Sequence, residues 1–331
     1  PGGVSHTDNV VYIDNINITK RPEVPVLRAA YRKDENTSLY NSQLDYYVPG
    51  RKAQKWIIAY QITGLEDVDL NNVEMYDTVE ELTQRRVFYN VAPNRMYNYA
   101  VKAVYAPGDT SPWSAISRLA IEQVCWDENF EGTASDWSFK TTSGAAWAIG
   151  SHSSHNCLYC GNTVNTRTMA WRTSPMLYKG VTYTLRVEYK CDVENNYDYA
   201  RLMFTSLDFS PNPESFNGTN SSIGTPSGYQ NLFTASASSS SWVGWAGTFS
   251  VTSDAKRKLV ALYRTDGGST GKNVNPAFDN IFICYPATPQ ATCPVATSVT
   301  LSDVTRTTAK VRWNVPVNDT GFYHDWVLEY G

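Results

Sequence analysis

The sequence lacks a charge excess, a long apolar run and the common catalytic signatures, and each absence excludes a class of protein. Its 28 Lys and Arg residues nearly balance 32 Asp and Glu residues and are scattered, so no nucleic-acid surface is expected. No apolar run approaches the ~20 residues that a helix needs to cross a bilayer, so we expect no membrane insertion of this segment. A Gly-x-Ser-x-Gly elbow, a Walker loop and a His-Glu-x-x-His motif are missing, so we expect no enzyme.

The residues that are abundant favour an all-β protein with more than one domain. A length of 331 residues exceeds what one hydrophobic core usually serves. The 22 tyrosines and 10 tryptophans, with many Thr and Val residues and regular turn signals, predict antiparallel β-sandwiches. The stretch TVEELTQRR at 78–86 fits a short loop helix or a charged edge strand. The Ser/Asn-rich stretch 217–240 predicts a long, mobile loop region.

Two short motifs recur at the same spacing. Asp14-Asn15-Ile16 returns as Asp279-Asn280-Ile281, 265 positions later, and Gly2-Gly3 returns as Gly267-Gly268 at the same interval. We therefore expect the chain to be a window of a longer repeat array. Residues 1–21 would be the last strand of a preceding jelly roll and a linker, since KRPEVPV is a Pro-spaced connection.

Residues 22–121 carry alternating strand patterns and an aromatic corner motif. Pro93, Tyr97 and Val101 follow Val91 in the stretch VAPNRMYNYAV. This pattern resembles the fibronectin type III family, and the resemblance implies a sandwich in which the Tyr97 hydroxyl bonds to the upstream backbone. Residues 289–331 resemble the N-terminal part of a second such domain, whose core Trp313 corresponds to Tyr46 in the first copy. Three strands lack covering partners there, so we expect an incomplete sandwich.

Residues 122–288 contain four motifs in a fixed order. The motifs are Phe130-Glu131, Trp171 with Ser174-Pro175, Tyr183-Thr184-Leu185 and Asp279-Asn280-Ile281. In this order they resemble the MAM-like jelly-roll modules, which include the cleaved-adhesin domains of secreted bacterial proteins. The resemblance implies an antiparallel jelly roll without catalytic activity, at the surface of a bacterium or secreted from it by type IX secretion.

Three functions are open, of which the first two follow from these resemblances. The first is a structural and adhesive role in an extracellular array, with other repeats of the same polypeptide, and a surface glycan or a partner protein, as contacts. The second is a carbohydrate-binding accessory module of a larger enzyme that degrades glycans or proteins. The third is an enzyme with an unrecognised site; carboxylates cluster at 127–131 and 192–198, but acidic residues are ordinary in surface loops.

One tryptophan pair provides the candidate for ligand binding. Trp242 and Trp245 are three residues apart in SSSSWVGWAGTF, so in a strand their side chains face opposite ways. Trp245 is the ligand candidate if it faces outward. The alternative is that Trp245 covers the edge of the core.

A carboxylate in the last jelly-roll strand suggests a metal site. In AFDNIFI, strand alternation places Asp279 on one face with Ala277 and Ile281, among apolar neighbours. A buried carboxylate needs a compensating partner. Because the jelly-roll resemblance implies a cation between the first and last strands, we expect a structural Ca²⁺ ion held by Glu131 and Asp279 and completed by Asp127 or Asn162. The alternative is that backbone amides donate to Asp279 without a metal.

A second candidate metal site is the stretch HSSHNCLYC. His152, His155, Cys157 and Cys160 are zinc-ligand types within nine residues. In a strand, however, Cys157 and Cys160 point to opposite faces. We therefore favour a strand without zinc.

The six cysteines favour an oxidising, extracellular compartment over buried thiols in the cytosol. If the first and last jelly-roll strands pair antiparallel with Glu131 near Asp279, Cys125 lies opposite Cys284. A disulfide there would close a long loop and add roughly 4–5 kcal/mol in the chain-entropy model. The rival bridge is Cys284–Cys293, across the linker.

Overall fold

The computed structural model describes the chain in segments. These are residues 23–33, 37, 39–63, 75–80, 84–132, 136–152, 154–161, 163–191, 193–194, 197–216, 224–235, 239–268, 274–290 and 297–314. The first copy of the Asp-Asn-Ile motif, the candidate ligand Asn162, and Cys293 lie outside the described residues. No helix among the described residues is long and apolar enough to cross a membrane.

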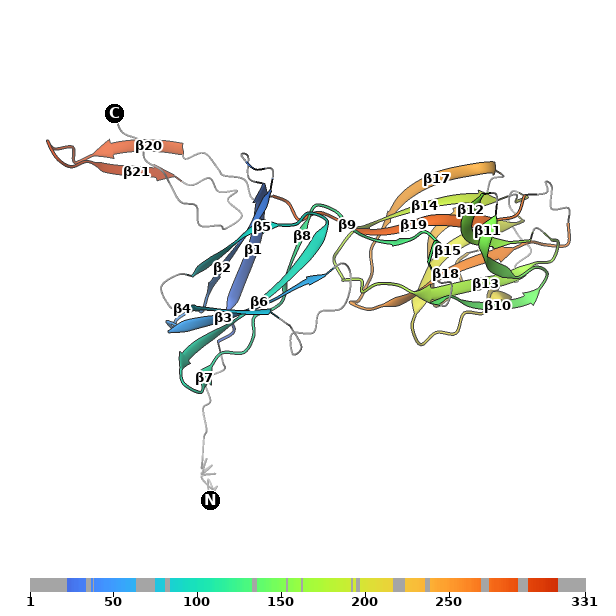
Figure 1. Cartoon of the computed structure of the whole chain (residues 1–331), viewed down its shortest axis with the longest axis horizontal. Helices are drawn as coiled ribbons and strands as arrows, with labels where there is room; N and C mark the ends of the chain where they lie inside the picture. The colour runs from blue at the N-terminus through green and yellow to red at the C-terminus, as the bar shows by residue number, and fades with distance from the viewer. Residues whose placement is uncertain are drawn as a thin grey trace, which may run out of the picture.

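The N-terminal part of the chain is a sandwich of two antiparallel sheets (Figure 1). Its hydrophobic core lies between the sheets and includes Tyr46 beside Trp56, with ring centroids 4.9 Å apart, which confirms the core position expected for Tyr46. The first sheet has the order β1 (Val26–Lys33), β2 (Tyr40–Tyr47), β5 (Arg85–Val91). The second has the order β4 (Met75–Glu80), β3 (Lys55–Thr63), β6 (Arg95–Ala106), β7 (Asp109–Thr110), with β8 (Ser117–Ile121) also paired to β6.

Local chemistry confirms two expectations for this sandwich. The Tyr97 hydroxyl accepts a hydrogen bond from the backbone N–H of Ala92 at 2.7 Å, so the predicted tyrosine corner is formed. Within 78–86 the described residues form the end of edge strand β4 and the start of β5, so the edge-strand alternative is correct there.

The second part of the chain is a larger antiparallel sandwich, the jelly roll of Figure 1. Aromatic and aliphatic side chains from both sheets, among them Trp147, Phe204 and Phe278, pack between them. The five-stranded sheet has the order β10 (Ser138–Ser143), β13 (Arg167–Thr173), β18 (Arg257–Arg264), β15 (Tyr199–Ser206), β16 (Tyr229–Ala235). The six-stranded sheet has the order β11 (Trp147–His152), β12 (His155–Cys160), β19 (Ala277–Tyr285), β14 (Tyr183–Cys191), β17 (Ser239–Phe249), and β9 (Val124–Glu128) pairs with β19.

The first and last jelly-roll strands pair antiparallel, as the sequence predicted. Ile281 lies opposite Glu128 and Cys284 lies opposite Cys125. Cys125 and Cys284 form a disulfide, which confirms the favoured bridge and excludes Cys284–Cys293. Because β12 pairs with 277–278 and β9 with 281–285, the two strands share one edge of β19.

Two expectations about irregular segments have different outcomes. The predicted loop region 217–240 contains strand β16 and the start of β17, so that prediction was wrong for those residues; cross-strand pairing stabilises polar sequences whose composition alone suggests a loop. After the jelly roll, β20 (Thr297–Ser302) and β21 (Lys310–Asn314) form a two-stranded sheet, on which Val299 and Leu301 are exposed. The incompleteness of this third sandwich remains a prediction.

Candidate functional site: the outer face of the six-stranded sheet

A β-bulge in β19 places Asp279 on the outer face of the six-stranded sheet. Arg186 pairs with Phe282 and Glu188 pairs with Asp279, so β19 contains one residue more than β14 between these pairs. Asn280 adopts a φ of 46° there, a left-handed conformation that asparagine tolerates better than most residues. The expected shared face of Asp279 and Ile281 was therefore wrong, because the bulge interrupts strand alternation: Phe278 and Ile281 both belong to the core.

The Asp279 carboxylate is covered by its neighbours although it lies on the outer face. The residue is 3% exposed. Its Oδ1 accepts the backbone N–H of Asn280 at 2.7 Å, and its Oδ2 lies 3.3 Å from Nδ1 of His155 on β12. Burial raises the pKa of Asp279, and the hydrogen bonds from Asn280 and His155 oppose that rise. Both oxygens of Asp279 have partners in the structure, and the carboxylate positions His155.

His155 and Trp242 form the exposed part of the arrangement. The His155 side chain is 44% exposed, and its ring centroid lies 5.1 Å from the Trp242 ring. In the neutral tautomer that carries its proton on Nδ1, His155 donates to Asp279 and Nε2 is an acceptor. Trp242 adds an indole N–H that is buried without a hydrogen-bond partner among the described residues. This pair therefore offers the aromatic ring of the half-buried Trp242 together with the exposed imidazole of His155.

Glu188 and Asn280 extend the polar face across the bulge. The Asn280 Nδ2 donates to Glu188 Oε2 at 2.8 Å, and Glu188 pairs with Asp279 on one side and Gly244 on the other. Gly244 has no side chain, so it leaves open space beside Glu188. Glu188 is the half-buried carboxylate of this pair, whereas Asp279 is covered. The two-carboxylate arrangement of a glycosidase would need a second accessible carboxylate beside Glu188, and Asp279 is covered.

Cys157 lies on this outer face but is covered by its neighbours, so its thiol is not available as a nucleophile. It is fully buried on the same face of β12 as His155. Burial raises the pKa of the Cys157 thiol to about 12, and the Asp279 carboxylate acts in the same direction. The thiol is therefore protonated at neutral pH, and catalysis or metal binding would need the thiolate.

The zinc candidates do not converge. Cys160 belongs to the core, whereas Cys157 lies on the outer face, as strand alternation predicted. His152 stacks on Tyr159 at 5.0 Å, and His155 contacts Asp279. Among the described residues, no group of three His, Cys, Asp or Glu side chains is arranged to hold a metal ion.

The predicted calcium ligands occupy separate surroundings. Glu131 is exposed, and its Oε2 accepts the side-chain N–H of Asn156 at 2.8 Å. Asp127 is an exposed residue of β9, opposite Phe282. The described part of the chain does not gather Asp127, Glu131 and Asp279 into one metal-binding group. The Ca²⁺ ion itself stays a prediction.

The buried acid near the first jelly-roll strand is Glu128, which sequence reasoning did not single out as a structural residue. Glu128 Oε1 accepts the backbone N–H of Phe130 at 2.9 Å, and Oε2 accepts the Trp137 indole N–H at 3.2 Å. Arg172 forms an ion pair with the same carboxylate. The ion pair with Arg172 anchors β9 to the opposite sheet, and this partner is too distant in sequence to be recognised from a local pattern.

Trp245 and Trp242 face opposite sides, as expected. Trp245 packs against the core, with its ring centroid 4.8 Å from that of Phe233. The alternative in which Trp245 covers the core edge is therefore the correct one. Trp242, and not the ligand candidate Trp245, is the member of the pair on the outer face.

Comparison with solved structures finds xylan-binding and cleaved adhesin domains at low sequence identity. A xylan-binding domain from CBM 22 is 17% identical, with 50% of this chain and 96% of that chain covered and a TM-score of 0.32. The K3 cleaved adhesin domain of Lys-gingipain from Porphyromonas gingivalis is 13% identical, with coverages of 48% and 97% and a TM-score of 0.29. The CBM22-1 xylan-binding domain from Paenibacillus barcinonensis is 12% identical, with coverages of 50% and 95% and a TM-score of 0.30. No family model and no curated protein sequence matches the chain. Sequence identities and TM-scores this low do not allow the ligand of any of those proteins to be assigned to this chain.

Proposed function

We propose that this chain is a non-catalytic binding segment of an extracellular adhesive protein, and that the outer face of its six-stranded sheet binds a glycan. The observation that carries the proposal is the His155–Trp242 pair held over the covered carboxylate of Asp279. Sugars present hydroxyl groups and patches of C–H bonds. An aromatic ring beside polar donors and acceptors suits both.

The surroundings support binding rather than catalysis. Asp279 is engaged by two neighbours, Cys157 is a buried protonated thiol, and Glu188 is left as the accessible acid of this arrangement. The Cys125–Cys284 disulfide supports an oxidising, extracellular location. The tyrosine corner at Tyr97 supports a fibronectin type III-like assignment for the first sandwich. The MAM-like or cleaved-adhesin assignment of the jelly roll belongs to the same proposal.

The alternative function is a spacer that binds no ligand and only connects other domains. It is favoured by the close packing between the two sandwiches, where Met96 and Ala120 share a buried cluster with Val124. A glycan array probed with the purified chain separates the two functions. Binding that Trp242→Ala abolishes supports the proposal, whereas an array without specific signal supports the spacer.

A further inference from the structure

The chain passes from the first sandwich into the jelly roll without a flexible linker. β8 ends at Ile121 and β9 begins at Val124, so only Glu122 and Gln123 lie between them. The Glu122 carboxylate accepts a hydrogen bond from the hydroxyl of Tyr40, which belongs to the first core. A connection of this length, fixed by a side-chain contact, leaves little freedom for hinge motion.

Apolar side chains of both sandwiches meet at this junction. Met96 and Ala120 of the first sandwich pack in one buried cluster with Val124, and Trp126 and Tyr285 of the jelly roll pack against it. Removing such a cluster from water favours the docked arrangement, because burial contributes about 25 cal/mol per Å² of apolar surface.

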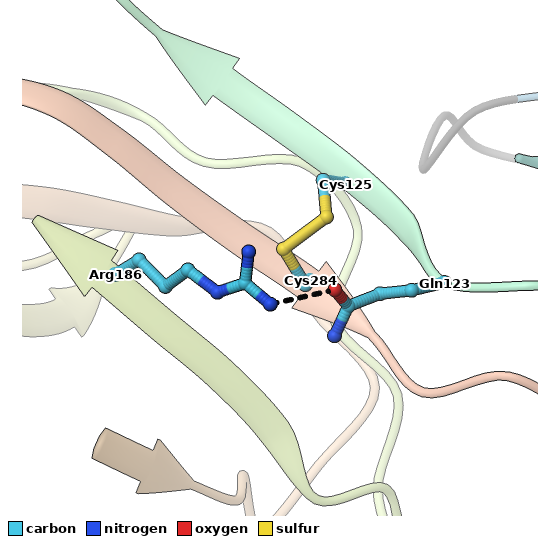
Figure 2. The surroundings of a disulfide bond; sticks show 4 residues. All are labelled: Gln123, Cys125, Arg186 and Cys284. Atoms are coloured by element: carbon cyan, nitrogen blue, oxygen red, sulfur yellow. Dashed lines mark hydrogen bonds between the residues drawn. A yellow bond between two sulfur atoms is a disulfide. The ribbon is translucent and has the colours of Figure 1, made fainter. Parts of the chain in front are cut away.

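Polar and aromatic contacts flank the buried cluster. The Arg118 guanidinium lies 3.8 Å from the centre of the Tyr178 ring, a cation–π contact between the sandwiches. Arg186 of β14 donates to Gln123 at 3.1 Å, directly beside the Cys125–Cys284 disulfide (Figure 2). The first contact joins the two sandwiches directly, and the second fixes the connecting residue Gln123 to the jelly roll.

The chain that leaves the jelly roll returns to the first sandwich. The backbone N–H of Thr288 donates to the carbonyl of Ala120 at 3.0 Å, and the Ala120 N–H donates to the Thr288 hydroxyl, also at 3.0 Å. Ala120 lies in β8, which pairs with β6 on its other side. Pro286 and Pro289 flank Thr288 and restrict the backbone of the outgoing segment.

We propose that the described residues of 23–121 and those of 124–290 form one rigid body, and that Thr288 anchors the outgoing chain on the edge of β8. The jelly roll is then a rigid arm of the first sandwich. The chain enters it at β9 and leaves it after β19, and both points lie beside β8. Figure 1 shows the β20–β21 hairpin on the same side of the jelly roll as the first sandwich. Asp279 lies six residues before the end of β19, so the outer-face site is about 20 Å along the arm from the junction.

The rigid junction is tested by measuring the distance between two spin labels on the whole chain with pulsed electron paramagnetic resonance. Labels introduced through unnatural amino acids at the exposed Lys55 and Lys140 report one position in each sandwich. We expect a single narrow distance peak, broadened when Arg118→Ala and Thr288→Pro are combined, and unchanged in the control Arg306→Ala. A broad distribution in the unmodified protein, or no broadening in the double variant, would overturn the proposal.

Hydrogen exchange tests the Thr288 anchor separately. Thr288→Val removes the hydroxyl acceptor and keeps the backbone N–H. We expect the Ala120 amide to exchange roughly fivefold faster, the effect of losing one net hydrogen bond. Thr248→Val, at an exposed threonine of β17, is the matched control. An Ala120 amide that exchanges at the same rate in both variants contradicts the anchor, whatever the glycan experiments show.

Discussion

Asp279 and His155 lie 124 positions apart in the sequence, on different strands, and their side chains meet on the outer face of the jelly roll. The contact depends on the bulge at Asn280, which turns Asp279 outward while Phe278 and Ile281 remain in the core. A regular strand would have buried the carboxylate among apolar side chains. The bulge instead makes it a support for an exposed histidine.

The first prediction concerns stability and pH for Asp279→Asn. Burial raises the pKa of Asp279 in the folded protein, so between the ordinary aspartate pKa of about 4 and the raised value the folded state binds more protons than the unfolded state. The contribution of this group to stability is therefore full below pH 4 and falls as the pH rises through the folded pKa. In chelator, Asp279→Asn should gain stability relative to the parent across this pH range.

Urea unfolding of both proteins between pH 3 and pH 7 measures this difference. The parent and the variant should differ least at the acidic end. A variant that loses stability steadily as the pH rises would show that the ionised carboxylate is favoured by its surroundings, contrary to the raised pKa.

Calcium binding is tested with the same variant. If Glu131 and Asp279 hold Ca²⁺, the melting temperature of the parent is higher in Ca²⁺ than in excess chelator, because the metal binds only the folded state. Asp279→Asn then abolishes the difference. Equal melting temperatures of the parent in both buffers contradict the calcium site.

The disulfide prediction concerns the double variant Cys125→Ser, Cys284→Ser. The bridge closes a loop with a sequence separation of 159, so the chain-entropy model predicts a loss of roughly 4–5 kcal/mol in the free energy of unfolding. Peptide mapping of the non-reduced protein checks the pairing, and denaturant unfolding checks the size. A loss below about 1 kcal/mol would mean that the bridge constrains little.

The tyrosine corner gives a matched pair of variants. Tyr97→Phe removes the hydroxyl that accepts the Ala92 N–H, so we expect the first sandwich to lose about 1 kcal/mol. Tyr89→Phe is the control, because Tyr89 is 72% exposed and should change stability little. Thermal unfolding of both variants is the measurement. An equal effect of the two substitutions would remove the corner as a stabilising feature.

Pairing register was accessible from the sequence because it depends on a simple count. Once the two terminal jelly-roll strands were assumed to pair, the bridge between Cys125 and Cys284 followed from their positions. Strand alternation also placed Cys157 and Cys160, and Trp242 and Trp245, on opposite faces. These predictions depend only on the two-residue period of a strand.

The composition of the outer-face site was not accessible in the same way. The bulge at Asn280, a residue in the left-handed conformation, reverses which face of the sheet the preceding residues of β19 occupy. Local sequence does not show that a bulge is present. His155 reaches Asp279 through the order of strands in the sheet, which brings β12 beside β19. Glu128 was missed for a similar reason, because its partner Arg172 comes from the opposite sheet. The bulge at Asn280, the His155–Asp279 contact and the Glu128–Arg172 ion pair all depend on which strands pack together in the fold.

The most direct test of the proposed glycan site is calorimetric titration of the whole chain with the glycan that the array identifies. Trp242→Ala should weaken binding tenfold or more, about 1.4 kcal/mol, as expected for an aromatic side chain at the centre of a binding surface. Trp113→Ala, at a half-buried tryptophan of the first sandwich, is the matched control and should leave the affinity unchanged. The account predicts this split between the two tryptophans, and equal affinities of Trp242→Ala and the parent would contradict it.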